Sequence, residues 1–381
     1  MGNVSVEEEE EYNMMLKDVP RNSFGVTGLF SCVASCFNAQ GEDVSPVILR
    51  GLWKNLFLFT FDAQKGGALS FGAHDWTLFP DFTTACEVCT TLGYSYQHFK
   101  DLEWGQAWNL IKKAMSENKP VITTWEPPEI HYPWFVLIVG YDEETKKVFL
   151  HSYKGAFYEY SLEDFRRGWE KGKSEQPWLY GAIFVLGEKK REISFKEVVL
   201  QSFRLAVENM RKKRVTFPAV KGKSGEGTFR CGFSAYEELI DYLDKERDYS
   251  KLDMDALKLI GGWGSCHEAD CEDTKRHSIA DYLLYVASEF KGDKRRHVER
   301  AAELYRRVEC LYDNLLIIHP STTPWGRQGY SHLPSLESDE PTLKEQAVKN
   351  FAIDLKAAAK IVRDILDKEK KAIQELEKVI Q

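Results

Sequence analysis

The sequence of 381 residues lacks a long apolar run, and its longest, at 134–140, is only as long as one strand. A helix that spans a bilayer needs about 20 apolar residues, so we expect no membrane partner. An excess of positive charge is also missing: the formal net charge is −8, and we therefore expect no nucleic-acid partner. The stretch 1–15 lacks the basic start and the apolar core of a secretory signal, so we expect a cytoplasmic protein.

Cysteine is sparse too. Eight cysteines in 381 residues are too few for a small scaffold held together by disulfides. Hydrophobic residues make up 43% of the chain and charged residues 29%, which suits a globular protein with one large or two medium domains.

The pattern of apolar residues changes near Gly187. Helical and alternating strand-like patterns mix before this glycine, whereas only helical periodicity follows it. We therefore predict an α+β domain at 21–188 and an all-helical domain at 189–381, after an acidic, disordered N-terminus at 1–20. The last helix, from about Leu343, should pack on the helix that ends at Ile318, or should pair with the same helix of a second copy to form a homodimer.

The expected elements follow from these patterns and from turn and cap residues. Strands are predicted at 55–62, 67–73, 94–99, 120–125, 134–142, 147–152, 156–161 and 178–187. Helices are predicted at 24–40, 43–53, 79–93, 101–119, 161–172, 194–213, 233–246, 273–290, 295–318 and from 343 onward.

Several stretches resemble one known family. Gly41, Val44-Ser45, Gly51-Leu52 and the run FLF at 57–59 match the pattern near the start of the butirosin biosynthesis protein H N-terminal domain, a relative of the C39-like peptidases. ENKPVITTW and WFVLIVGYDEETKKVFLHSYKG match its later strands, and the stretches at 232–243 and 301–320 look like its helical extension.

This resemblance implies a papain-like (C39-like) fold for the N-terminal domain and acyl-cysteine chemistry. In such families a cysteine at the start of the first helix is paired with a histidine on a strand, and the helix dipole and the imidazolium lower the pKa of the thiol. The implied activity is acyl transfer from a carrier-protein thioester to an amine, or hydrolysis of an amide. The implied partners are an acyl-carrier, a peptide or a small-molecule substrate.

The family's catalytic positions carry other residues in this chain. Its cysteine falls on Gly28, its histidine on Trp134, and its third residue on His151 or Ser152. Glycine offers no nucleophile, and the indole nitrogen of tryptophan accepts no proton at neutral pH.

A displaced site is one interpretation: Cys32, one helical turn after Gly28, would act with His131, and His151 would be the third member. In the other interpretation Cys32 is a buried core thiol and His131 a loop residue. We favour the second interpretation, because a cysteine in the second turn gains little from the helix dipole.

Four cysteines are paired at helical spacing, Cys32 with Cys36 and Cys86 with Cys89. If the two helices converge, four thiolates could bind zinc or an iron–sulfur cluster. Core packing explains the same pairs without a cofactor, and we expect no cofactor on that ground. Cys266, His267 and Cys271 form a further candidate metal set, although a helix start is the simpler interpretation.

Three functions thus follow from the sequence. The first is a cysteine acyltransferase or amide hydrolase with displaced residues. The second is a catalytically inactive papain-fold protein that serves as a binding or scaffold module. The third is a metal or redox protein that uses the paired cysteines.

Overall fold

The fold comes from a computed structural model of the chain. It describes residues 13–16, 19, 28–61, 82–126, 134–152, 156–175, 181–217, 227–248, 251, 266–318 and 340–381. The chain divides into two compact units: Met1–Arg50 with Phe79–Phe195, and Gly51–Leu78 with Lys196–Gln381. This division differs from the single boundary expected near residue 188, because the stretch that begins at Gly51 belongs with the second unit.

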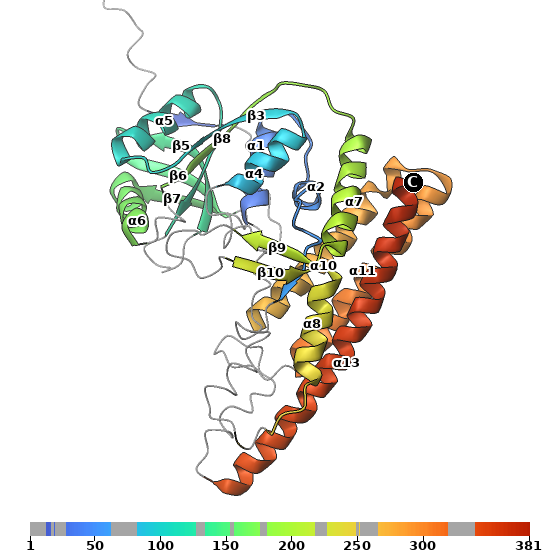
Figure 1. Cartoon of the computed structure of the whole chain (residues 1–381). Coiled ribbons are helices and arrows are strands. Elements are labelled where there is room, and N and C mark those ends of the chain that lie inside the picture. Colours follow the sequence, from blue (N-terminus) through green and yellow to red (C-terminus); the bar gives the residue numbers. More distant parts are fainter. Residues whose placement is uncertain are drawn as a thin grey trace, which may run out of the picture. The chain divides into compact units, whose positions relative to one another are not determined.

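The first unit is built on a seven-stranded antiparallel sheet in the order β3-β8-β4-β5-β6-β7, with β1 pairing with β5 (Figure 1). The strands are β1 (Asn13–Met15), β3 (Tyr94–Phe99), β4 (Val121–Trp125), β5 (Trp134–Asp142), β6 (Lys147–Ser152), β7 (Phe157–Ser161) and β8 (Ile183–Lys189). Six of these follow the alternating or buried runs of the sequence, so the α+β character of this unit is confirmed.

The strand β1 was not expected. It pairs antiparallel with β5, with Met15 opposite Gly140, so the prediction of disorder over 1–20 is wrong at Asn13–Met15. A Cβ at Gly140 would lie 2.7 Å from the carbonyl oxygen of Met14. The glycine therefore permits the close approach of this short strand. The strand was not predicted because the acidic composition of residues 1–20 favours disorder.

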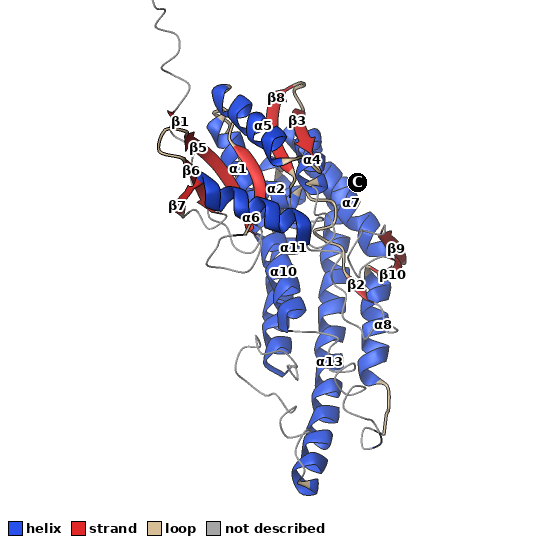
Figure 2. Ribbon diagram, turned by 90° about the vertical axis from the view of Figure 1, so that its left-hand side faces the viewer, coloured by secondary structure: helices blue, strands red, loops and turns tan. Residues whose placement is uncertain are grey.

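Helices cover both faces of the sheet (Figures 1 and 2). On one face, the Trp125 indole of β4 donates a hydrogen bond of 3.0 Å to the Phe165 carbonyl oxygen. On the other face, Phe82, which directly precedes α4, contacts the rings of Phe135 and Phe184. The helices of this unit are α1 (Gly28–Ala39), α4 (Thr83–Thr91), α5 (Trp104–Ser116), α6 (Leu162–Glu175) and α2 (Pro46–Gly51), which leads into the second unit. Because both faces are covered, every residue of β4 is buried.

The second unit contains long helices and a small sheet (Figure 2). Its helices are α7 (Phe195–Arg211), α8 (Phe233–Asp244), α10 (Cys266–Val286), the short 3₁₀ helix η5 (Ala287–Glu289), α11 (Gly292–Ile318) and α13 (Pro341–Ile380). Its sheet has the order β2-β10-β9, with β2 (Thr60–Phe61), β9 (Arg214–Phe217) and β10 (Gly227–Cys231).

This small sheet corrects the prediction of an all-helical C-terminal domain. The strands β9 and β10 are short, and their sequence lies beside a glycine-rich stretch that favours a loop interpretation. They form because they pair with each other antiparallel. The other edge of β10 pairs with β2, which comes from a distant part of the sequence. The expected helices of this part are confirmed, although α10 begins earlier than the predicted 273.

The long helix α13 packs its apolar stripe inside its own chain, against α11 and α8. Its stripe residues are buried: Leu355, Ala359, Val362, Ile373, Leu376 and Val379. This confirms that the last helix packs on the helix ending at Ile318, while pairing with a second copy stays a prediction. Among the helices that the structure describes, none combines the length and the apolarity needed to cross a bilayer.

A buried ion pair lies at the centre of these helices. The Arg276 guanidinium of α10 donates a hydrogen bond of 2.8 Å to the Glu369 carboxylate of α13, and both side chains are fully buried. The Tyr236 hydroxyl of α8 donates to the same carboxylate at 2.9 Å and accepts a hydrogen bond from Arg276 at 2.7 Å. Tyr305 and Tyr312 of α11 complete the network, so four helices meet at one pair of charges.

We predict that Gly168→Ala destabilises the first unit by about 1–3 kcal/mol, because a new Cβ would lie 2.4 Å from the Trp125 indole nitrogen and 2.7 Å from the Glu126 carbonyl oxygen. Gly105→Ala is the matched control, since a Cβ there meets nothing within 4 Å and alanine favours a helix. Urea denaturation followed by fluorescence measures both. A Gly168→Ala protein as stable as the control would contradict this packing.

We predict that Glu369→Ala lowers the free energy of unfolding of the second unit by about 3–5 kcal/mol, because it leaves the Arg276 charge buried without its partner. Asp367→Ala on the same helix removes only an exposed pair with Lys371 and should change stability far less. Circular dichroism at 222 nm during urea denaturation compares the two variants. Equal losses would show that the buried pair contributes no more than a surface pair.

Candidate functional site

The helix α1 spans Gly28–Ala39 and places Cys32 one turn after Gly28, the residue that the sequence resemblance aligned with a catalytic cysteine. Every residue from Gly28 to Phe37 is buried, so this helix has no solvent-facing side over that stretch. Cys32 is 2% exposed. Burial raises the pKa of its thiol to about 12 and is the one cause of that shift within the described residues.

The expected base is His131 and the expected third residue is His151, and only His151 is among the described residues. His131 lies outside the described residues. His151 lies in β6, where its backbone is opposite Leu137 of β5 and Phe157 of β7. Residues opposite one another share a face of the sheet, and this register places His151 on the face turned away from Trp125 and α6, which α4 and α1 cover.

His151 is buried among apolar neighbours on that face. It is 7% exposed, and its ring lies 5.8 Å from the ring of Phe157. Cys32 forms no hydrogen bond to an imidazole among the residues that can be placed. The structure therefore puts Cys32 and His151 on one side of the sheet without joining them as a catalytic pair.

The four paired cysteines of α1 and α4 are neighbours. The pKa of the Cys36 thiol is raised by burial and then by the charges of Cys32 and Cys89, while that of Cys89 is raised by burial and then by Cys86. The charge of Cys32 thus raises the pKa of Cys36, that of Cys89 also raises the pKa of Cys36, and that of Cys86 raises the pKa of Cys89. Convergence of the four thiols on one metal ion stays a prediction.

The neighbouring thiols lack the features of a preformed metal shell. Within the described ranges, no group of three or more His, Cys, Asp or Glu side chains is arranged to hold a metal ion. The Cys36 Sγ lies 4.0 Å from the Pro120 carbonyl oxygen, as a weak donor in an apolar setting would. Cys266, His267 and Cys271 belong to α10, but their side chains lie outside the described set.

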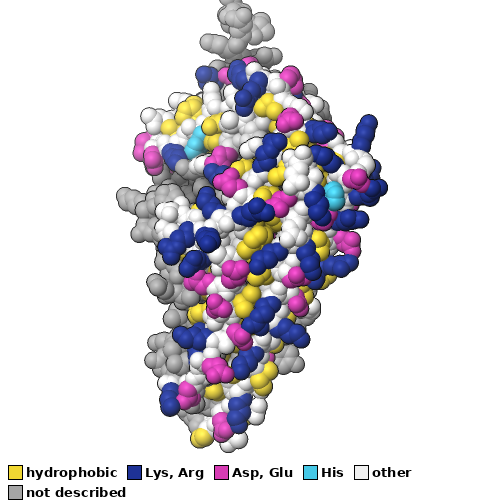
Figure 3. All heavy atoms as spheres, turned by 45° about the vertical axis from the view of Figure 1, so that its right-hand side comes forward, with side chains coloured by type: hydrophobic (Ala, Val, Ile, Leu, Met, Phe, Trp, Pro, Cys, Tyr) yellow, Lys and Arg dark blue, Asp and Glu magenta, His cyan; other side chains and the backbone are white. Residues whose placement is uncertain are grey.

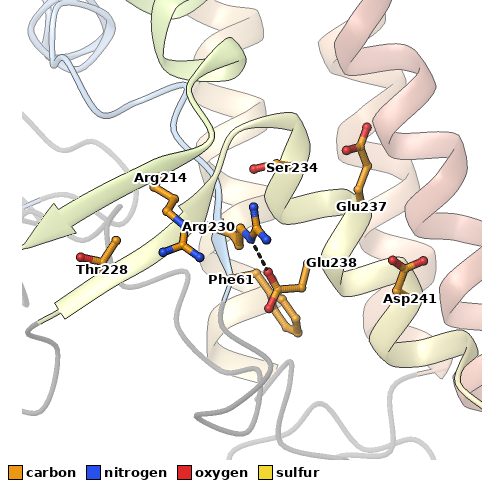
Figure 4. A pocket seen from close by; sticks show the side chains of 8 residues that line it. All are labelled: Phe61, Arg214, Thr228, Arg230, Ser234, Glu237, Glu238 and Asp241. Atoms are coloured by element: carbon orange, nitrogen blue, oxygen red, sulfur yellow. Dashed lines mark ion pairs between the residues drawn. The ribbon is translucent and has the colours of Figure 1, made fainter.

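Sequence reasoning missed a polar pocket in the second unit, formed by β2, β9, β10 and α8 (Figure 4). Its volume is about 500 Å³. It is lined by Phe61, Arg214, Thr228, Arg230, Ser234, Glu237, Glu238 and Asp241. The available signal was the alternation of polar and apolar residues in RVTF and TFRC, which the loop interpretation of this stretch obscured.

Charges of both signs are interspersed over the face of the molecule in Figure 3, with apolar side chains in narrow strips between them. A single-sign field of the kind that attracts nucleic acid is not visible on the described part of this face.

No known protein-family model matches the chain, and a search of curated proteins returns no match.

We expect purified protein to carry less than stoichiometric zinc or iron, because burial raises the pKa of the thiols of Cys32, Cys36 and Cys89 and so favours protonated sulfur over metal-binding thiolate. Elemental analysis after purification without added metal measures this. Near-stoichiometric metal that disappears in Cys36→Ala would contradict the expectation and establish a metal site.

Proposed function

We propose that the protein is a catalytically inactive binding or scaffold module, with a first unit of papain-like (C39-like) type that has lost its cysteine nucleophile. The observation that carries this proposal is the burial of Cys32. A thiol with a pKa of about 12 is ionised in roughly one molecule in 10⁵ at neutral pH, whereas acyl-cysteine chemistry needs the thiolate.

The arrangement of α1 supports the same proposal. A catalytic cysteine of this type lies at the first turn, where the helix dipole stabilises the thiolate. Gly28 occupies that turn, and the next cysteine is buried. A cytoplasmic location belongs to this proposal, as does the bound partner that the family resemblance implies: a carrier-bound acyl group, a peptide or a small molecule.

A displaced acyltransferase or amide hydrolase is the second candidate. The specific observation in its favour is that His151 shares the sheet face covered by α1 and α4. This function would require Cys32 to become exposed and to meet His151 or His131 within about 3 Å.

Site-resolved alkylation separates the two functions. We predict that iodoacetamide near pH 6 leaves Cys32 unmodified in the folded protein, because its thiol is both buried and protonated. Cys310, which is exposed, is the internal reference for reagent access. Peptide mass spectrometry after timed quenching measures both sites.

The variant His131→Ala is the second arm of this experiment, and it should leave the rate at Cys32 unchanged. Rapid modification of Cys32 near pH 6 that slows in His131→Ala would overturn the proposal in favour of the displaced catalytic pair.

A further inference from the structure

The pocket in the second unit contains a row of side chains that crosses its small sheet. Arg230 of β10 is directly opposite Arg214 of β9 on one side and Phe61 of β2 on the other. Residues opposite one another point to the same face, and all three line the pocket. The other face of the hairpin is apolar and buried, with Phe229 at 2% and Cys231 at 0% exposure.

Two guanidinium groups directly opposite one another repel, so this pair requires a counterion. Arg230 has one, since its Nε lies 3.2 Å from the Glu238 carboxylate of α8. Arg214 forms no ion pair with any carboxylate in the described part of the chain. Among the described residues, one positive charge on this face therefore has no counterion.

The opposite wall of the pocket is one side of α8, where Ser234, Glu237, Glu238 and Asp241 are spaced at helical intervals. Glu237 pairs with Lys370 of α13 at 3.1 Å, and Glu238 pairs with Arg230. Asp241 forms no ion pair with a described cation. The wall thus offers one unmatched negative charge.

Figure 4 shows the order of these charges: Arg214 and Asp241 lie on either side of the Arg230–Glu238 ion pair. Apart from the Phe61 ring, the lining is polar and includes the Thr228 and Ser234 hydroxyls. The volume of about 500 Å³ is in the range of small-molecule sites, which spans roughly 300–1,000 Å³.

We propose that this pocket binds a small zwitterionic, peptide-like ligand, whose carboxylate is held by Arg214 and whose amine is held by Asp241. A purely anionic ligand would meet the Glu238 and Asp241 carboxylates, and a purely cationic one would meet two guanidinium groups. A ligand with one charge at each end matches both unpaired groups and leaves the central ion pair intact. This inference does not depend on whether Cys32 reacts.

Three probes of almost equal size test the proposal: triglycine, N-acetyl-triglycine without the amine charge, and triglycine amide without the carboxylate. An extended tripeptide is about 10 Å long, so its two charges are separated. We expect triglycine to bind the full-length protein about tenfold more tightly than either blocked form, because each block removes one charge-assisted hydrogen bond. Ligand-observed NMR titration measures the three dissociation constants.

Two variants assign the ends of the ligand. In Arg214→Gln, triglycine and triglycine amide should bind equally, because the carboxylate has lost its partner. In Asp241→Asn, triglycine and N-acetyl-triglycine should bind equally, because the amine has lost its partner. Both wild-type side chains are exposed, so neither variant should unfold the protein, and circular dichroism verifies this.

Matched surface variants control for overall charge. Arg204→Gln on α7 and Asp364→Asn on α13 change exposed residues that do not line the pocket, and both should keep the wild-type preference for triglycine. Equal binding of all three probes to wild type, or a preference that survives in both Arg214→Gln and Asp241→Asn, would overturn the proposal and leave the pocket as a hollow filled by water.

Discussion

The two-sided burial of the main sheet is the constraint on which the first unit depends. Its central strand β4 is buried along its whole length, so helices must cover both faces. One of these helices is α1, which is buried at every residue from Gly28 to Phe37. A cysteine in its second turn must then be a core residue, and the low polarity of that core keeps its thiol protonated. The packing of the sheet and the raised pKa of the Cys32 thiol thus have one cause.

In the second unit the corresponding constraint is electrostatic. Arg276 and Glu369 are both fully buried, and such a pair is tolerated only when other hydrogen bonds satisfy the remaining polar atoms. Tyr236 supplies those contacts, and it also stacks on Phe59 at 4.0 Å between ring centroids. This tyrosine therefore links the charged centre of the helices to the chain segment that leads into β2. We infer that the network fixes the register of α8, and with it the wall of the pocket.

Much of the fold was accessible from local pattern. The strands β3 to β7 and the helices α5 and α11 lie close to their predicted bounds, because each has a clear period and clear turn residues at its ends. The strands that were not predicted have a different origin. Each of β1, β9 and β10 has five residues or fewer, and each exists because a partner strand supplies hydrogen bonds from elsewhere in the chain. Such pairing is a tertiary effect, which a local pattern does not encode.

The same distinction applies to the functional residues. The positions of Cys32 and of the four paired cysteines follow from helical spacing, so sequence reasoning found them and also found the reason to doubt a nucleophile. The pocket was missed because its key relation, Arg214 opposite Arg230, arises from the register between two strands. A single sequence shows two arginines sixteen positions apart, whereas the register turns them into neighbours, of which Arg230 pairs with the Glu238 carboxylate. The arrangement of charges in this pocket is therefore a property of strand pairing, in a part of the chain whose local pattern indicated only helices and a loop.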